Sequence, residues 1–261
     1  MASNRSENTY QKIDTIFLRD VNNIIMPYSG FVSPELEWLR NCKFDATEKI
    51  DGTNMRIEVT CKIIEGELHM VVEYKGKSDE AQIPPHLYKY MVETFPKEKV
   101  LAALDLPEII TPAVLEEKGW GIPKYTIYGE GYGVKIQKGG NYISNGVGFI
   151  VFDVKVNDWW LLRNNVVEIA EKLGAPVVPY MGQFTIDEAI EFVRKGFKST
   201  IAENKEYLAE GLVLTSPYGI KNRKGERIIF KIKHKDFAMY KARYGTDGPV
   251  EQTPNRFQRN N

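Results

Sequence analysis

The sequence predicts an α+β protein built mainly from antiparallel sheet, and three observations support this fold class. Apolar residues alternate with polar ones at Met55, Ile57 and Val59, which is typical of a half-buried strand. Strand-like runs over 45–60 and 61–75 follow each other through short turns, as in hairpins. Helix signals are confined to a few segments, so helices flanking a mainly antiparallel sheet are the economical architecture.

The N-terminal 45 residues are expected to form a segment that covers one edge of the core. Ser33 can cap a short helix that has Pro34 at its first position. From Pro85 to Glu117 the pattern is mostly helical and is punctuated by prolines. We expect one main domain over 46–243 and a flexible tail over 244–261.

Later elements are bounded by clear signals. A helix over 164–173 should stop at Gly174, and Thr185 with Glu188 forms a capping box that opens a helix to about residue 197. A short basic helix should follow residue 233. Further strands are expected over 125–130, 147–156, 210–215 and 227–233.

The overall composition is that of a soluble globular protein. The chain has 261 residues, of which 43% are hydrophobic, and its 35 basic residues balance 35 acidic ones. No run of about 18 apolar residues and no apolar leader is present, which predicts a cytoplasmic protein without a membrane partner. Cys42 and Cys61 are too few for a disulfide framework and are expected to be buried thiols.

Local charge is less even than the total. The segment Lys221 to Arg243 holds nine Lys and Arg against Glu226 and Asp236. Such a run is usually a solvated face. Apolar residues interleave with it around Phe230, however, so some of these cations should lie on a strand that packs against the core.

Several common chemistries find little support. Gly129, Gly131 and Gly133 lack the spacing and the following helix of a dinucleotide-binding loop, and no phosphate-binding P-loop sequence is present. The histidines at 69, 86 and 234 are isolated and are expected to be surface or packing residues.

Lys49 is the most suggestive single residue, because it lies on a turn that enters the strand beginning near Asn54. Taken alone, the Asp51-Gly52 corner favours a plain hairpin with a solvated lysine. An amine on a rigid turn can also reach into a cleft and serve as a nucleophile.

Other strand-borne polar groups change that balance. Glu130 ends one strand, Glu210 begins another, and Lys231 and Lys233 project from the same face of a third. An amine, carboxylates for magnesium and two cations for phosphate are what nucleotidyl transfer through a lysine adduct requires.

With these residues, the sequence resembles the covalent nucleotidyltransferases, which comprise ATP-dependent DNA ligases, RNA ligases and mRNA capping enzymes. The stretch from Glu48 to Asn54 looks like their KxDG nucleophile motif, and five more motifs follow in the family's order over residues 44–237. They are Gly76-Lys77-Ser78, Tyr128-Gly129-Glu130-Gly131, Phe149 to Val154, Ala209 to Leu214, and Phe230-Lys231-Ile232-Lys233.

Within that superfamily the sequence is most similar to the phage-type RNA ligases that seal nicks in duplex RNA, the type 2 class. DNA ligases and capping enzymes continue into an OB-fold domain, whereas only 28 residues follow Lys233, so no OB-fold domain is expected. Two positions depart from the pattern. Lys77 stands where arginine is usual, and Asp51 stands where the best-known type 2 member has histidine.

The resemblance implies an ATP-dependent RNA ligase with the adenylation-domain fold. Lys49 would carry AMP, which would pass to a 5′-phosphate before a 3′-hydroxyl displaces it, as in RNA repair. Catalytic roles are implied for Lys49, Lys231 and Lys233, and Mg²⁺, with Mn²⁺ as an alternative, for Glu210 and Asp51. Nucleotide contacts are implied for Glu48, Lys49, Ile50, Asn54, Lys77, Glu130, Phe152, Glu210, Lys231 and Lys233.

The expected partners are RNA ends or nicked duplex RNA, and the expected state is a monomer. Three alternatives stay open. The chain could be a DNA ligase, a GTP-using capping-type enzyme, or a non-catalytic nucleic-acid-binding module on the same fold. For Lys135 and Lys138, a solvated loop and contact with the RNA backbone are equally compatible with the sequence.

Overall fold

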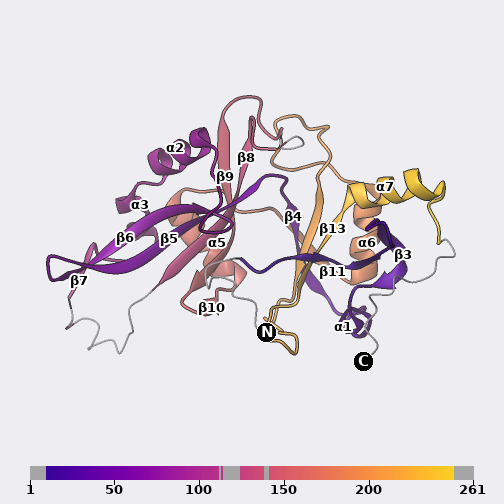
Figure 1. The fold of residues 1–261 in the computed structure, drawn as a ribbon, viewed down its shortest axis with the longest axis horizontal. Coiled ribbons are helices and arrows are strands. Elements are labelled where there is room, and N and C mark those ends of the chain that lie inside the picture. The colour runs from indigo at the N-terminus through magenta and orange to yellow at the C-terminus, as the bar shows by residue number, and fades with distance from the viewer. Residues whose placement is uncertain (1–9, 112, 114–123, 138–140, 250–261) are drawn as a thin grey trace. The chain divides into compact units, whose positions relative to one another are not determined.

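A computed structural model describes residues 10–111, 113, 124–137 and 141–249 (Figure 1). The chain divides into two compact units. Unit 1 comprises residues 51–178 with the short stretches 1–10 and 202–204, and unit 2 comprises residues 11–50, 179–201 and 205–261.

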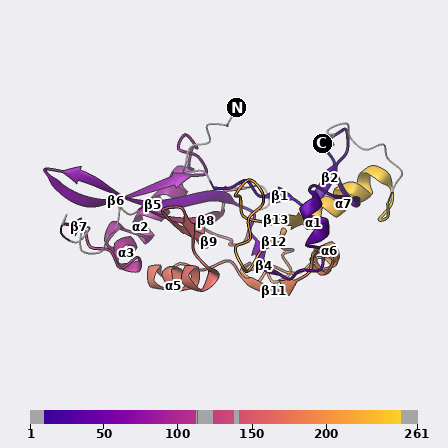
Figure 2. The same cartoon turned by 90° about the horizontal axis from the view of Figure 1, so that it is seen from below.

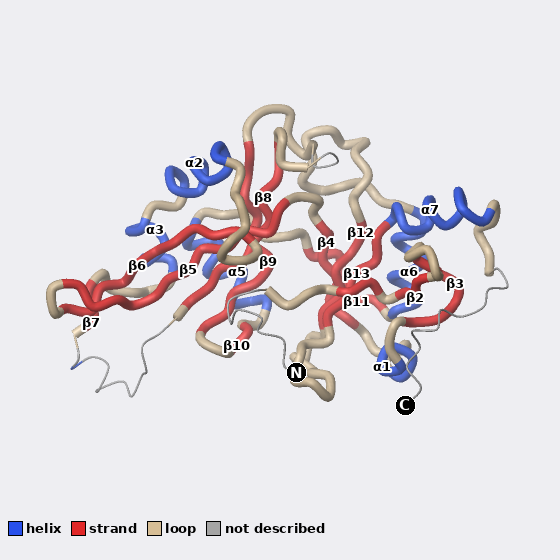
Figure 3. Tube along the Cα trace, viewed as in Figure 1, coloured by secondary structure: helices blue, strands red, loops and turns tan. Residues whose placement is uncertain are grey.

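Unit 1 is built on a six-stranded sheet, and Figure 3 colours its strands red. Every neighbouring pair of these strands is antiparallel. The strand order is β10-β9-β8-β5-β6-β7. The strands are β5 (Thr53–Ile64), β6 (Glu67–Gly76), β7 (Ile109–Ile110), β8 (Tyr125–Gly133), β9 (Val147–Val156) and β10 (Trp159–Trp160).

Three helices cover one face of this sheet (Figure 2). They are α2 (Pro85–Thr94), α3 (Lys97–Ala103) and α5 (Arg163–Leu173). Met55, Ile57 and Val59 point to these helices and are fully buried in the core, as their alternation predicts. The opposite face of β5 therefore presents the alternate residues Asn54, Arg56 and Glu58.

Unit 2 contains a five-stranded sheet in the order β1-β13-β12-β4-β11. β1 runs parallel to β13, and the other neighbours are antiparallel. Its strands are β1 (Asp14–Thr15), β4 (Phe44–Lys49), β11 (Tyr180–Phe184), β12 (Gly211–Thr215) and β13 (Ile229–Lys233); β2 (Phe17–Arg19) and β3 (Ile25–Phe31) form a separate pair.

Among the described residues, unit 2 contains the helices α1 (Pro34–Trp38), α6 (Ile186–Lys195) and α7 (His234–Tyr244). The helix α6 packs against β12 and β13 through the buried side chains of Ile186, Ala189 and Val193. This packing buries one face of the sheet and leaves the lysines of β4 and β13 on the other.

The helix boundaries follow the sequence signals closely. The Thr185 hydroxyl accepts a hydrogen bond from the Glu188 amide, and the Glu188 carboxylate accepts one from the Thr185 amide at 2.7 Å, so the predicted capping box is formed. Gly174 ends α5 in the left-handed conformation, with φ of 67°. Pro34 begins α1, whereas the Ser33 side chain makes no cap hydrogen bond.

The fold class is confirmed, but the hairpin expected at the lysine turn is wrong. β4 ends at Lys49 and β5 begins at Thr53, and these two strands belong to different sheets. The glycine of the turn has another purpose, because a Cβ atom on Gly52 would lie 2.2 Å from the carbonyl oxygen of Gly131 on β8. Gly52 is thus required by close backbone approach rather than by a hairpin corner.

Two smaller expectations need correction. The segment expected to be mostly helical over 85–117 includes β7, which pairs with β6 because Ile109 and Ile110 extend the sheet edge. Cys42 is exposed rather than buried, since it lies in the turn that follows α1, while Cys61 is half-buried. Residues 250–261 of the expected tail and Lys138 lie outside the described residues.

No helix among the described residues is long and apolar enough to cross a membrane.

Candidate active site

The strand register of unit 2 places the predicted lysines in adjacent rows on one face of the sheet. Gly211 of β12 lies between Lys49 of β4 and Lys233 of β13. Two residues further along, Val213 lies between Thr47 and Lys231. Because alternate residues of a strand share a face, Lys49, Lys231 and Lys233 project on the same side of the sheet.

Glu210, which directly precedes Gly211, joins two of these lysines. One oxygen of its carboxylate accepts a bond from Lys49 Nζ at 2.6 Å, and the other pairs with Lys233 Nζ, also at 2.6 Å. The Glu210 side chain is only 9% exposed, against 20% for Lys49 and 21% for Lys233. This lysine–glutamate–lysine bridge is therefore largely shielded from water. Charge interactions are stronger in such surroundings than in water.

Gly211 allows that bridge to form. A Cβ atom at this position would lie 2.0 Å from the carbonyl oxygen of Ile232 on the neighbouring strand. The close approach of β12 and β13 at the row of the bridge therefore requires glycine.

The protonation state of the bridge follows from its charges. Burial alone would raise the pKa of Glu210, but the charges and hydrogen bonds of Lys49 and Lys233 outweigh it and lower that pKa below its ordinary value. Glu210 is thus held as a carboxylate. It occupies the Lys49 amine in an ion pair, and this pair must be broken before Lys49 can act as a nucleophile.

Lys231 is in a different electrostatic position. It is half-buried, and no hydrogen bond or ion pair with another described residue involves it. Burial, followed by repulsion from Lys233 and Lys49, lowers its pKa from 10.5 to about 8. An unpaired, partly desolvated cation of this kind is suited to receive an anion.

A cavity of about 280 Å³ lies beside Lys231 and Lys233 within unit 2. Its lining includes the cations Arg19, Lys231, Lys233 and Lys235. Two buried oxygen atoms of lining residues, Thr15 Oγ1 and Asp236 Oδ2, have no hydrogen-bond partner in the part of the chain that is described. The cavity is therefore suited to a polyanion that also accepts or donates hydrogen bonds.

Glu48 and Ile50, the neighbours of Lys49 in the motif, make contacts within the protein. Glu48 points to the opposite face of β4, where it is 1% exposed. Its carboxylate accepts hydrogen bonds from the Ser199 hydroxyl and from the Thr200 amide and hydroxyl, each of the latter two at 3.1 Å. Ile50 is buried, and its carbonyl oxygen accepts a bond from Lys49 Nζ at 3.3 Å. Nucleotide contact by Glu48 and Ile50 stays a prediction.

Unit 1 brings together a second set of the predicted residues on the sheet face that the helices leave uncovered. Asn54 lies directly opposite Glu130 in the β5–β8 register. The side-chain oxygen of Asn54 is buried and lacks a hydrogen-bond partner among the described residues. A buried polar atom without a partner can accept a hydrogen bond from a ligand or from water.

Phe152 occupies a β-bulge on the neighbouring strand. Tyr128 pairs with Asp153 and Gly129 pairs with Val151, so Phe152 is the extra residue without a partner on β8. Bulges re-aim side chains and are frequent beside active sites. The Phe152 ring is half-buried and contacts Tyr10 with ring centroids 5.1 Å apart.

Lys77 lies on an exposed turn that a buried arginine holds in place. Arg56 is fully buried on β5, and its guanidinium donates hydrogen bonds to the Gly76 carbonyl oxygen and to the Asp79 carboxylate, on either side of Lys77. A third bond joins Arg56 Nε to Glu58 Oε1 at 2.7 Å. Arg56 thereby ties the turn to the central strand.

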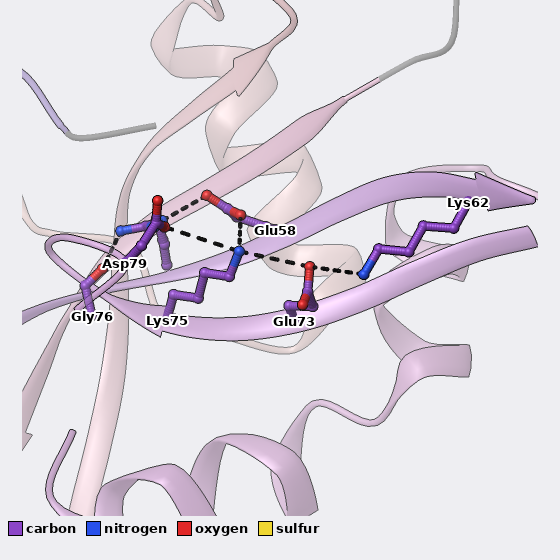
Figure 4. A network of polar contacts seen from close by, with 7 residues as sticks. Glu58, Lys62, Glu73, Lys75, Gly76 and Asp79 are labelled. Carbon is purple, nitrogen blue, oxygen red and sulfur yellow. Dashed lines mark hydrogen bonds and ion pairs between the residues drawn. The ribbon is translucent and has the colours of Figure 1, made fainter. Parts of the chain in front are cut away.

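A longer charge network continues from Glu58, the partner of this arginine (Figure 4). Lys75 pairs with Glu58 at 2.8 Å and lies 3.6 Å from Glu73, which in turn is 3.6 Å from Lys62. Burial would raise the pKa of Glu58, but hydrogen bonds from Lys75 and Arg56 lower it overall. The network thus runs from a buried guanidinium to the exposed outer part of the β5–β6 hairpin.

The predicted metal ligands are placed differently. Glu210 belongs to unit 2, whereas Asp51 belongs to unit 1, where its backbone amide donates to the Tyr142 hydroxyl at 2.8 Å. No group of three or more His, Cys, Asp or Glu side chains suited to a metal occurs within the described ranges. Mg²⁺ commonly takes one or two carboxylates together with waters and phosphate oxygens, so the chemistry of Glu210 fits it.

Sequence reasoning missed several residues of this region. Arg19, Thr15 and Asp236 line the cavity but belong to no motif, although Asp236 falls inside the basic segment that was noted. Tyr10, which packs on Phe152, lies in a segment without any pattern. Only the run of cations at 231, 233 and 235 carried a signal.

Comparison with solved structures identifies the fold. Three structures of Naegleria gruberi RNA ligase are similar: a point mutant with AMP and Mn (TM-score 0.53, 15% identity), another with ATP and Mn (0.53, 16%) and a form with PPi (0.52, 17%). In the same order, the matches cover 89%, 89% and 92% of this chain. They cover 57%, 58% and 63% of the N. gruberi chains. The fold is thus that of an RNA ligase, over about six tenths of the relatives' length.

The sequence itself gives the family. Residues 43–233 match the model of the RNA ligase family, so the chain belongs to that family. No curated protein matches the sequence significantly.

Proposed function

We propose that the protein is an ATP-dependent RNA ligase that joins a 3′-hydroxyl to a 5′-phosphate. The observation that carries this proposal is the lysine–glutamate–lysine bridge of Lys49, Glu210 and Lys233, with the unpaired cation Lys231 beside it. Membership of the RNA ligase family supports the same conclusion. The N. gruberi RNA ligase structures with ATP, AMP and Mn are consistent with the nucleotide.

The reaction has three steps. Lys49 loses a proton, and its Nζ attacks the α-phosphorus of ATP, so that an N–P bond forms and the bond to the β-phosphate breaks with release of pyrophosphate. An oxygen of the RNA 5′-phosphate then attacks the same phosphorus and releases Lys49. Finally the 3′-hydroxyl attacks the 5′-phosphate, and AMP leaves.

The cations of unit 2 would stabilise the charge that moves in the first step. Lys233 lies in the same row as Lys49 and Lys231 in the next one, and both would neutralise the α-phosphate oxygens. The cavity lined by Arg19 and Lys235 would accept the β- and γ-phosphates and then the leaving pyrophosphate. Its excess of cations over the single carboxylate of Asp236 supports this role.

The uncovered sheet face of unit 1 would hold the nucleoside. Asn54 and Glu130, opposite each other in register, would bind the ribose hydroxyls, and Phe152 would stack on adenine. Lys77 would contact the ribose or the RNA end from its exposed turn. The buried, unpartnered oxygen of Asn54 is the observation that favours a ligand there.

Glu210 would bind Mg²⁺ directly or through its waters, and Asp51 of unit 1 stays a predicted ligand. A bound Mg²⁺ supplies charge neutralisation at the phosphate. Because the Glu210 carboxylate now pairs with Lys49, any cation that took over this carboxylate would also release the Lys49 amine. Mn²⁺ is the alternative ion.

The test of the proposal has two stages. Incubation with α-labelled ATP and Mg²⁺ should first leave an acid-labile AMP adduct on the protein, and this adduct should be absent in Lys49→Ala. Nicked duplex RNA, single-stranded RNA and the matched DNA substrates are then compared. We expect sealing of 5′-phosphorylated RNA and little sealing of all-DNA nicks.

Other outcomes identify the alternatives. An adduct formed from GTP rather than ATP would indicate a capping-type enzyme, and preferential sealing of DNA would indicate a DNA ligase. Salt-sensitive RNA binding without any adduct would indicate a non-catalytic binding module. Each of these results would overturn the proposal.

The lowered pKa of Lys231 predicts a pH dependence. If the cation is needed, kcat/KM for adenylation, which reports the free enzyme, should fall as the pH rises through about 8. Lys231→Arg stays charged at every pH, so it should lose this falling limb. An unchanged limb in Lys231→Arg, measured from pH 6 to 10, would contradict the assignment.

The lowered pKa of Lys231 also makes the free energy of unfolding depend on pH. The folded-state pKa of Lys231 lies below its ordinary value of 10.5, so the unfolded chain binds more protons between about pH 8 and 10.5. The contribution of this lysine to the free energy of unfolding therefore rises with pH in that window.

We also propose that the protein acts as a monomer in the cytoplasm. Its two cysteines are free thiols, which agrees with a reducing compartment.

A further inference from the structure

A tyrosine from outside the family-matched residues packs into the face where the nucleoside is proposed to bind. Tyr10 is only 5% exposed, although it directly follows the undescribed residues 1–9. Its ring makes edge contacts with Tyr128, Phe152 and Trp160, with centroid distances of 5.0, 5.1 and 5.4 Å. The family match begins only at residue 43.

The Tyr10 hydroxyl is also specifically held. It donates a hydrogen bond of 2.8 Å to Asp153 Oδ2, and both groups are buried. Tyr10 therefore contacts two consecutive residues of β9, Phe152 through its ring and Asp153 through its hydroxyl.

These two residues form the bulged part of β9. Phe152 has no partner across the ladder, so the register of the sheet does not fix its side chain. Edge-to-face contact has a preferred geometry, and the Tyr10 and Phe152 rings are inclined by 73°. Tyr10 thus supplies the orientation that the missing strand partner does not.

We propose that Tyr10 is a positioning residue for the purine base: it holds the bulge at Phe152 and Asp153 so that the Phe152 ring presents its face to the base. The inference rests on the proposed function, because it assumes that a nucleotide binds on this face. Tyr10 acts through Phe152 and does not itself react. Its effect should therefore fall on nucleotide affinity and spare the chemical step.

Three variants separate this role from a general loss of packing. Tyr10→Leu removes both the ring and the hydroxyl, whereas Tyr10→Phe keeps the ring and loses only the bond to Asp153. The matched control is Tyr74→Phe on β6, which removes a tyrosine hydroxyl that donates to the Phe95 carbonyl oxygen, on the helix-covered face of the same sheet. Urea unfolding of each variant measures the change in stability.

Affinity is read with two probes. The dissociation constant of α,β-methylene ATP, which cannot transfer AMP, reports the base and phosphates together, and inhibition by tripolyphosphate reports the phosphates alone. KM and kcat for adenylation by ATP are measured in parallel. For Tyr10→Leu we expect about a tenfold rise in KM and in the dissociation constant, with kcat and tripolyphosphate inhibition unchanged.

Tyr10→Phe should show a smaller rise, and Tyr74→Phe should show none. The proposal is overturned if Tyr10→Leu binds α,β-methylene ATP as wild type does, or if tripolyphosphate inhibition weakens equally. Failure of the ligase function is distinguishable, because a wild type that binds the analogue but forms no adduct still reveals the effect of Tyr10 on affinity. A wild type that binds neither probe refutes both.

Discussion

Glu210→Gln is expected to lower the rate of lysine adenylation by about 10²–10³-fold, because the carboxylate has two successive roles. In the free protein it bridges Lys49 and Lys233 at 2.6 Å each, and during the reaction it is proposed to bind Mg²⁺. The neutral amide keeps the shape of the side chain but lacks the negative charge that both roles need. The rate is measured as the single-turnover formation of labelled protein over a range of Mg²⁺ concentrations.

Glu206→Gln is the matched control for this variant. Glu206 belongs to the same unit and pairs with Lys198 at 2.9 Å, but its side chain is 81% exposed. Its replacement should leave the rate unchanged. A Glu210→Gln protein that adenylates within about threefold of wild type at the same Mg²⁺ concentration would show that the bridge is only structural.

Arg56→Leu is expected to lower the free energy of unfolding by about 3–5 kcal/mol. Arg56 is fully buried, and its removal leaves the buried Glu58 with Lys75 as its remaining partner and releases Gly76 and Asp79. Total stabilities of natural proteins are about 5–15 kcal/mol, so the loss is large. Urea unfolding monitored by tryptophan fluorescence measures it.

The outer end of the same network supplies the control. Lys62 is 53% exposed and lies 3.6 Å from Glu73, so Lys62→Ala should change the free energy of unfolding by less than about 1 kcal/mol. If Arg56→Leu and Lys62→Ala lower the free energy of unfolding equally, the buried guanidinium is not the main stabilising group of the network.

Acid should weaken this network in wild type. The folded-state pKa of Glu58 lies below its ordinary value of 4.5, so its contribution to stability is present at neutral pH and is lost as the pH falls below about 4.5.

The sequence anticipated most of what the strands alone determine. Period-two alternation correctly indicated that Met55, Ile57 and Val59 face the core. The same rule placed Lys231 and Lys233 on one face of their strand, and the register of β13 agrees with it. These features depend on local pattern, which a single sequence displays.

Features that depend on how distant segments meet were not visible. The Asp51-Gly52 corner suggested a hairpin, because a tight turn looks the same whether the next strand pairs with the last one or joins another sheet. The contact of Tyr10 with Phe152 spans more than a hundred residues and has no pattern of its own. The cavity beside Lys231 likewise combines β1, β2 and α7 residues that no motif connects.

The most direct test of the proposed function is the identity of the residue that carries AMP. After incubation with ATP and Mg²⁺, proteolysis and mass spectrometry under conditions that preserve phosphoramidates should find one AMP on the peptide containing Lys49. Lys49→Ala should carry none, and pyrophosphate should remove AMP from the wild-type protein. AMP on another residue, or no AMP on a folded wild-type protein, would contradict the assignment of Lys49 as the nucleophile.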